Sequence, residues 1–200
     1  MQFIQPYITR FKEIYHDKKN RSIIDVLIFM VITYVFHELW WGFATEIKSL
    51  SFISNSADFL AYQVFLWSKW VNQHILDLPF TISTTKVNTF LFPSVNGYIA
   101  VEESCSGLKQ MYQIFFLFVL FPGPWKHKLW YIPASFFVMF LVNVFRIIAL
   151  SIILLTIPDY WHFSHDWILR PFFYVVLFGL WVLWVEKFRN PLLERKLQKT

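Results

Sequence analysis

The sequence lacks the residues that build covalently or metal-stabilised folds. Among its 200 residues there is a single cysteine, Cys105, which excludes an internal disulfide. No Cys and His residues have the spacing of a metal site, so no bound metal is expected. There is also no internal repeat, no low-complexity tract and no polar stretch long enough for a separate soluble domain. We therefore expect a single compact unit over residues 1–200.

Charge is scarce, whereas apolar and aromatic residues are abundant. Only 16% of the residues are charged, while 56% are hydrophobic and 22% are aromatic. A soluble domain of this size could not bury so much apolar surface. The net charge of +5 does not indicate a nucleic acid partner, because the basic residues cluster beside apolar segments as membrane flanks do. The chain is therefore predicted to be an integral membrane protein whose surroundings are lipids.

The apolar runs predict an all-α integral membrane bundle of about four transmembrane helices. Runs near the ~20 apolar residues that a bilayer requires occur at residues 23–43, 106–121, 129–157 and 167–185. Residues 57–76 are also apolar, but they include Lys69, Asn72 and His74, and their apolar positions recur at helical spacing. That pattern favours a helix lying in the membrane interface. The polar segments 45–56 and 158–166 and the basic segment 126–128 are expected to be connections.

A different periodicity appears between residues 79 and 104. Residues 80–84, 88–92 and 98–101 are typical of short strands, and Asn96-Gly97 is a strong turn signal before the last of them. We expect a small β element outside the bilayer. Its last strand leads directly to Cys105.

The distribution of Lys and Arg predicts the topology. Residues 1–22 hold five, residues 126–128 hold two and residues 186–200 hold five, whereas residues 158–166 hold none. If residues 57–76 do not cross, the three basic segments share one side, as the positive-inside rule requires. If residues 57–76 do cross, the two basic ends fall on opposite sides. We favour the first alternative, with residues 1–22 and 186–200 cytoplasmic and residues 79–104 extracytoplasmic.

Cys105 lies where a polar segment meets an apolar run, among small polar residues that include Ser106. These residues predict a helix start, with the cap somewhere in residues 103–106. A thiol in the first turn of a helix is polarised towards thiolate by the unsatisfied N–H groups. Glu102 and Glu103 oppose that effect. The alternative interpretation is a structural cysteine, which the position between a strand and a span disfavours.

Arg146 is unusual because it lies inside an apolar run. An arginine near the bilayer centre costs ~2.5–3.5 kcal/mol on insertion scales, so such residues usually face the bundle interior and have a partner. Asn143, three residues earlier, shares its helix face. Two interpretations remain open. Arg146 forms an ion pair with Glu102 or Glu103, or it is a fixed cation that stabilises an oxyanion.

His165 lies at the predicted outer boundary of the last span, beside Asp166. A histidine within reach of a thiol can act as a general acid and base, or hold a thiolate as an ion pair. His162 is the rival candidate, but His165 adjoins the span itself. Arg170 has the i, i+4 spacing to pair with Asp166. We interpret His37 as an interfacial, structural residue.

The order Cys, Arg, His at the outer ends of three successive spans resembles the exosortase/archaeosortase family. Residues 103–109, Glu-Ser-Cys-Ser-Gly-Leu-Lys, resemble its Cys-Ser-Gly motif. Residues 143–147, Asn-Val-Phe-Arg-Ile, resemble its Asn-x-x-Arg motif, and His165-Asp166 resembles its terminal His motif. The likeness covers roughly residues 98–174, and the short length and aromatic-rich composition look most like the exosortase F branch.

This resemblance implies a membrane cysteine protease or transpeptidase without metal or cofactor. It would cleave the C-terminal sorting signals of exported proteins through a cysteine acyl-enzyme and transfer them to an envelope acceptor. Cys105 would attack the carbonyl, Arg146 would hold the oxyanion and His165 would protonate the leaving amine. The candidate supporting residues are Asn143, Glu103, His162 and Ser106. The implied location is the bacterial cytoplasmic (inner) membrane, as a multi-pass protein whose active site faces the periplasm.

Two other functions fit the residues. A membrane cysteine acyltransferase acting on lipid donors would also place a thiol at the interface, and its adduct would be a fatty acyl group rather than a peptide. A non-enzymatic envelope assembly factor would need no reactive thiol. In that case, replacing Cys105 would leave the processing of exported proteins intact.

Overall fold

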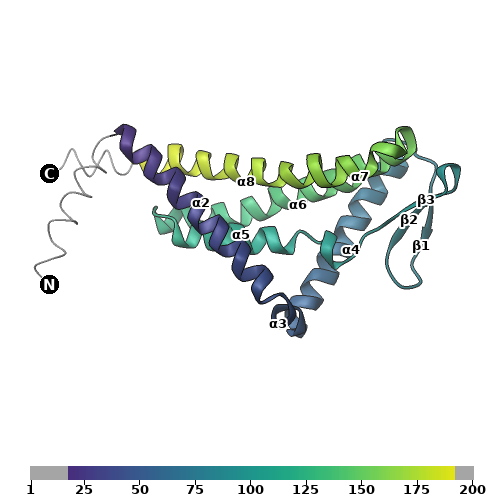
Figure 1. The fold of residues 1–200 in the computed structure, drawn as a ribbon, viewed down its shortest axis with the longest axis horizontal. Coiled ribbons are helices and arrows are strands. Elements are labelled where there is room, and N and C mark those ends of the chain that lie inside the picture. The colour runs from purple at the N-terminus through teal and green to yellow at the C-terminus, as the bar shows by residue number, and fades with distance from the viewer. Residues whose placement is uncertain (1–17, 192–200) are drawn as a thin grey trace, which may run out of the picture.

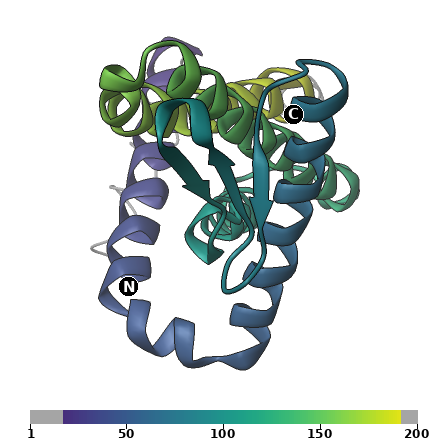
Figure 2. The same cartoon turned by 90° about the vertical axis from the view of Figure 1, so that its right-hand side faces the viewer.

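Long helices running side by side dominate the computed structural model, which describes residues 18–191 (Figure 1). The helices are α2 (Lys18–Gly42), α3 (Ala44–Ser49), α4 (Ser51–His74), α5 (Leu108–Leu120), α6 (Trp125–Thr156), α7 (Trp161–Phe163) and α8 (Arg170–Trp184). α2 and α4 lie on either side of the start of α5 and are joined through α3, and a small sheet lies at the end of the bundle where α4 finishes (Figure 2).

Within residues 18–191, three helices are long and apolar enough to cross a membrane, by their length and composition. They are Asn20–Gly42, Trp125–Thr156 and Pro158–Arg189, and Leu108–Leu120 is a shorter apolar helix. At ~1.5 Å per residue, α5 is about 20 Å long and extends through only part of a ~30 Å hydrocarbon core. The predicted all-α membrane bundle is confirmed as a fold class, whereas the individual span boundaries remain predictions.

The sheet contains β1 (Thr81–Ser83), β2 (Thr89–Phe92) and β3 (Gly97–Ala100) in the antiparallel order β1-β2-β3. Phe90 is paired with Ile82 on one side and Ile99 on the other. A short 3₁₀ turn, η1 (Pro93–Val95), and a left-handed Asn96 with φ 54° connect β2 to β3. Phe90, Phe92 and Ile99 are buried, so the sheet packs on the helices through one apolar face. This confirms the predicted β element, and its position outside the bilayer remains a prediction.

In the described part of the chain, two hydrophobic clusters form the core. The first joins α2, α5, α6 and α8 through residues such as Phe29, Ile114, Phe118, Met139, Leu177 and Trp184. The second joins α4, the sheet and α6 through residues such as Val64, Phe65, Phe90, Ile99, Ile147 and Leu150. Because α6 belongs to both clusters, the polar residues that it carries between them are held rigidly inside the bundle.

The interfacial helix predicted for residues 57–76 is part of α4, which begins at Ser51 and ends at His74. Some of its polar residues face α6 rather than a membrane surface. Ser68 Oγ donates to the carbonyl of Val144 at 3.5 Å, and Asn72 Nδ2 donates to Ser151 Oγ at 3.1 Å. α4 is not among the helices apolar enough to span, and its interfacial placement remains a prediction.

The predicted connections at residues 45–56 and 126–128 are wrong. The first segment forms α3 and the start of α4, because no Gly or Pro interrupts residues 44–74. The second lies in the first turn of α6. Lys128 there is buried, and its Nζ donates to the carbonyls of Val119 at 3.1 Å and Phe121 at 2.9 Å. The lysine thus satisfies carbonyls that the end of α5 leaves unpaired.

The predicted loop at residues 158–166 is also wrong. The segment forms a 3₁₀ turn, η3 (Pro158–Tyr160), then α7, and then a π-helical turn, η4 (Ser164–Leu169), that leads into α8 and η5 (Val185–Arg189). Pro158 suits the first position of a helix, where its missing N–H is no loss. Pro171 has no N–H to donate to the carbonyl of Trp167, and the wider π turn ends just before it. His165 lies inside this π turn.

The segments predicted to be cytoplasmic, residues 1–22 and 186–200, lie only partly within the described residues. Residues 1–17 and 192–200 are outside the described residues. Residues 18–22 form the start of α2.

Candidate active site

One pocket of about 460 Å³ is lined by Cys105, Arg146 and His165 together. The three residues come from separate elements. Cys105 ends the 3₁₀ turn η2 (Glu103–Cys105), Arg146 lies in the middle of α6, and His165 lies in η4. Residues from α2, α4, α5 and α8 complete the walls. The fold therefore brings together the three residues that the sequence singled out.

The cysteine loop is shaped by the two residues after Cys105. Gly107 is the N-cap of α5 and has a left-handed φ of 76°, so the cap predicted within residues 103–106 is wrong. Ser106 Oγ accepts the N–H of Leu108 at 3.2 Å and satisfies one of the first donors of the helix. Cys105 precedes the first turn of α5, which weakens the predicted helix-dipole effect because it falls off beyond that turn. Its half-buried thiol contacts the carbonyl of Ala100 and Ser104 Oγ, both at 3.9 Å.

Asn143 links this loop to α6. It is fully buried, and its Nδ2 donates to the carbonyl of Cys105. A Cβ on Gly107 would lie 3.1 Å from Asn143 Nδ2, so a side chain there would press on Asn143 and move it by a few tenths of an ångström. The glycine is thus needed for both its backbone conformation and its lack of a side chain. Asn143 thus ties the cysteine loop to α6.

A chain of polar contacts joins Arg146 to the surface. Arg146 Nη2 lies 2.8 Å from His165 Nε2, His165 Nδ1 lies 2.7 Å from Asp166 Oδ1, and Arg170 Nη1 lies 3.2 Å from the same oxygen. Arginine can only donate, so we assign Nε2 of His165 as the acceptor and Nδ1–H as the donor to Asp166. The resting imidazole is therefore neutral in this arrangement.

Aromatic neighbours hold the two central groups of that chain. The ring of Trp161 stacks on His165, with centroids 5.1 Å apart and an interplanar angle of 7°. The guanidinium carbon of Arg146 lies 5.8 Å from the centroid of Phe173, within the range of a cation–π contact. Arg146 is 8% exposed, and its Nε has no hydrogen-bond partner among the described residues. The cation therefore retains donor capacity beyond its bond to His165.

The other predicted residues are placed differently from one another. Glu103 lines the pocket and its Oε1 accepts from Ser54 Oγ of α4 at 3.1 Å, so it is engaged with α4. Among the described residues neither glutamate is ion-paired with Arg146, and the interpretation of Arg146 as their partner is wrong. His162 is exposed, contacts Trp161 with ring centroids 5.0 Å apart, and does not line the pocket.

Three residues in the pocket wall were missed or undervalued in the sequence. Lys109 Nζ lies 3.4 Å from His37 Nδ1 and 4.5 Å from the centroid of Trp41, and all three residues line the pocket. The available signal was the i, i+4 spacing of His37 and Trp41, which puts both on one face of α2. Within the described part of the chain, no group of three or more His, Cys, Asp or Glu residues is arranged to hold a metal ion.

Comparison with known proteins gives one match. The family model described as Transmembrane exosortase (Exosortase_EpsH) matches residues 21–182. No curated protein and no solved structure matches the chain. The matched region extends from α2 into α8 and contains every residue that lines the Cys105 pocket. It covers well over half of the sequence, and the chain therefore belongs to the transmembrane exosortase family.

Proposed function

We propose that this exosortase-family membrane protein is a cysteine transpeptidase that processes the C-terminal sorting signals of exported proteins. The observation that supports the proposal is the pocket lined jointly by Cys105, Arg146 and His165. A nucleophile, a cation with spare donors and a histidine fixed by a carboxylate are the groups that acyl transfer requires. Their catalytic roles, and the likeness to the exosortase F branch, remain predictions.

The first step of the proposed reaction is acylation. Cys105 Sγ attacks the carbonyl carbon of the scissile peptide bond, and the thiol proton passes to His165 Nε2. In the resting arrangement that nitrogen accepts from Arg146. Substrate therefore has to draw the guanidinium from His165 towards the developing oxyanion, which frees Nε2 as the base. Asp166 keeps the proton on Nδ1 and stabilises the imidazolium that forms.

The second step releases the signal. The tetrahedral intermediate collapses, the C–N bond breaks, and His165 Nε2 returns its proton to the leaving amine. The exported protein is left as a thioester on Cys105. An amine of the envelope acceptor then attacks the thioester, or water does so, and the free thiol is restored with its proton. Neither step changes an oxidation state.

Topology can be tested on the same cysteine. We propose that the protein lies in the bacterial inner membrane with Cys105 facing the periplasm, because the basic segments then share the cytoplasmic side. Cys105 is the only thiol in the chain, so labelling has no background from the protein itself. A membrane-impermeant maleimide should label it in cells whose outer membrane alone is permeabilised. Labelling seen only after the inner membrane is opened would refute this orientation.

The direct test of function is processing of an exported protein that ends in a hydrophobic helix and a Lys/Arg cluster. Cys105→Ala should abolish its processing while the amount of protein in the membrane is unchanged. Arg146→Lys should also be impaired, because an ammonium cannot replace the planar fork of donors. Intact processing of every such protein by Cys105→Ala would exclude the proposed reaction.

A further inference from the structure

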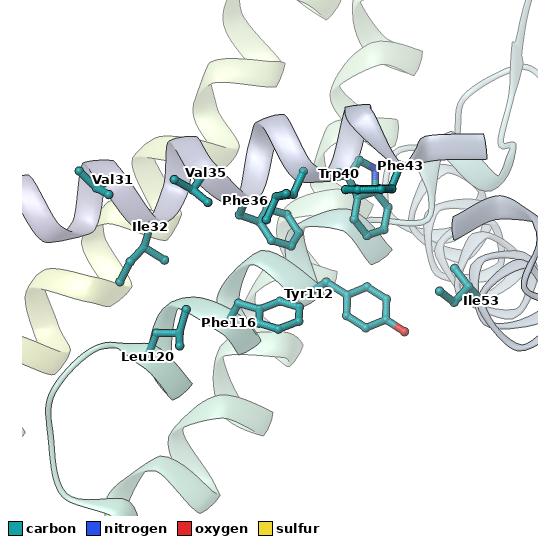
Figure 3. A pocket seen from close by; sticks show the side chains of 11 residues that line it. Val31, Ile32, Val35, Phe36, Trp40, Phe43, Ile53, Tyr112, Phe116 and Leu120 are labelled. Carbon is teal, nitrogen blue, oxygen red and sulfur yellow. The ribbon is translucent and has the colours of Figure 1, made fainter. Parts of the chain in front are cut away.

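An apolar groove lies beside the Cys105 pocket, between α2 and α5. Its volume is about 620 Å³, and its side chains face one another across the space between the two helices (Figure 3). Its walls include Val35, Phe36 and Leu39 of α2 and Tyr112, Phe116 and Leu120 of α5. The lining is almost entirely carbon, in contrast to the mixed lining of the neighbouring pocket.

The groove borders the candidate active site. Trp40 of α2 and Ile53 of α4 line both cavities, so the two are adjacent. A ligand that occupies both cavities would place one segment in the polar Cys105 pocket and the adjoining segment in the apolar groove. A polypeptide in which a polar segment precedes an apolar helix has the same order.

The groove belongs to the membrane zone of the molecule. It follows residues 31–40 of α2, within the candidate span Asn20–Gly42. In an apolar stretch of 18 residues from that span, only 17% are buried inside the protein, against 50% for the corresponding stretch of Trp125–Thr156, so α2 has the more open surface. Residues 31–40 extend over about 15 Å at ~1.5 Å per residue, about half of a ~30 Å hydrocarbon core. The groove is therefore long enough for several turns of a helix.

Its walls have the spacing that a third helix requires. Tyr112, Phe116 and Leu120 follow one another at i, i+4, and so do Ile32, Phe36 and Trp40 on the facing helix. Each row forms a ridge, and the groove between two ridges accepts the ridge of another helix. In lipid, association of this kind depends on close van der Waals packing rather than on a hydrophobic driving force.

We propose that this groove binds the transmembrane helix of the sorting signal, so that the polar segment before the helix enters the Cys105 pocket. The inference rests on the proposed function and adds to it the place where the substrate helix docks. The helix packs along α2 and α5 within the bilayer, and it reaches the groove laterally from the lipid.

Photo-crosslinking tests the docking without requiring turnover. The probe is a tagged exported protein encoded by the same organism that ends in a hydrophobic helix and a Lys/Arg cluster. A photoreactive benzoylphenylalanine replaces either Phe116, which lines the groove, or its neighbour Phe115, which does not. The two positions are matched, since their side chains are 43% and 42% exposed. We expect a substrate adduct when the photoreactive residue is at position 116 and none when it is at position 115.

Filling the groove gives a second measurement. Val35→Trp places a large ring in the groove, whereas Val175→Trp adds the same ring to an exposed position of α8 outside it. We expect Val35→Trp to raise KM about tenfold with kcat little changed, the signature of lost uniform binding. Val175→Trp should leave both constants near their original values.

The outcomes separate this inference from the proposed function. Processing that depends on Cys105, together with a substrate adduct from position 115 but not from position 116, would overturn the docking site alone. An adduct at position 116 with only lipid, or with a second copy of the chain, would overturn it as well, as would no adduct from either position. A substrate adduct at position 116 without any processing would support docking and contradict the proposed reaction.

Discussion

Two ionic clusters at opposite ends of the bundle differ in their access to solvent. Near the start of α2 and the end of α8, Asp25 and Arg189 form a buried ion pair whose side chains are 3% and 2% exposed. At the other end, near α7, the cluster of Arg146, His165, Asp166 and Arg170 runs from a buried guanidinium to a 60% exposed one.

The comparison teaches how to interpret a buried charge in this protein. Asp25 and Arg189 line neither the Cys105 pocket nor the groove, so their pairing only joins α2 to η5. Arg146 and His165 are also partly shielded from solvent, but both line a cavity together with the thiol of Cys105. We therefore expect substitutions at the first cluster to change stability and substitutions at the second to change turnover.

The largest expected effect comes from His165→Ala. Loss of a positioned general acid and base should lower kcat/KM about 10²–10⁴-fold. The control is His162→Ala, because His162 is exposed and lies outside the pocket. Processing rates of the two variants, at equal amounts in the membrane, provide the measurement. Equal losses from both variants would remove His165 from the proposed mechanism.

The buried pair should respond in stability instead. Asp25→Ala leaves Arg189 without its carboxylate partner inside the bundle, which should cost about 3–5 kcal/mol of unfolding free energy. The double variant Asp25→Leu with Arg189→Met should recover part of that loss, because Arg189 no longer remains as a buried charge, whereas the buried Arg21 still lacks its acidic neighbour. Unfolding of the detergent-solubilised variants measures both. If Asp25→Ala kept its full stability but lost turnover, the assignment of this pair to stability rather than to turnover would be wrong.

Gly107→Ala should have an intermediate effect. A side chain in the left-handed region costs about 1–2 kcal/mol, and the added Cβ would press on Asn143 beside Cys105. Gly179→Ala is the matched control, because nothing lies within 4 Å of a Cβ at that helical position. We expect Gly107→Ala to lose both stability and turnover, and Gly179→Ala to keep both. A neutral Gly107→Ala would show that the cysteine loop tolerates another geometry.

The smallest effect is expected at the exposed end of the polar chain. Arg170 is 60% exposed and pairs with Asp166 at i, i+4, a geometry typically worth about 0.3–0.5 kcal/mol. Arg170→Gln should therefore lower kcat/KM by no more than about twofold. A loss as large as that of His165→Ala would mean that Arg170 contacts the substrate.

Much of the fold follows from local patterns in the sequence. Apolar runs and alternating strands predicted the helical membrane bundle and the sheet, because both patterns reflect burial of nearby residues. The polar segments 45–56, 126–128 and 158–166 were wrongly predicted to be connections, because polarity alone does not end a helix. Lys128 shows why, since its long side chain reaches back to carbonyls of α5 while its backbone stays helical.

The site was accessible to prediction only in part. The order of Cys105, Arg146 and His165 pointed to a common location, and the structure lines one pocket with all three. The roles of Lys109 and His37 in the wall depend on how α2 packs against α5, which no local pattern encodes. The Asp25–Arg189 pair joins residues 164 positions apart, so only the assembled bundle reveals it.

Trapping the covalent intermediate is the measurement that tests the central claim most directly. The purified protein is mixed with the tagged exported substrate, quenched in acid, digested and analysed by mass spectrometry. We predict a thioester between Cys105 and the C-terminal residue of the truncated substrate, and its absence in Cys105→Ala. A fatty acyl group on Cys105 would indicate the acyltransferase instead, and an unmodified Cys105 during active processing would contradict the acyl-enzyme mechanism.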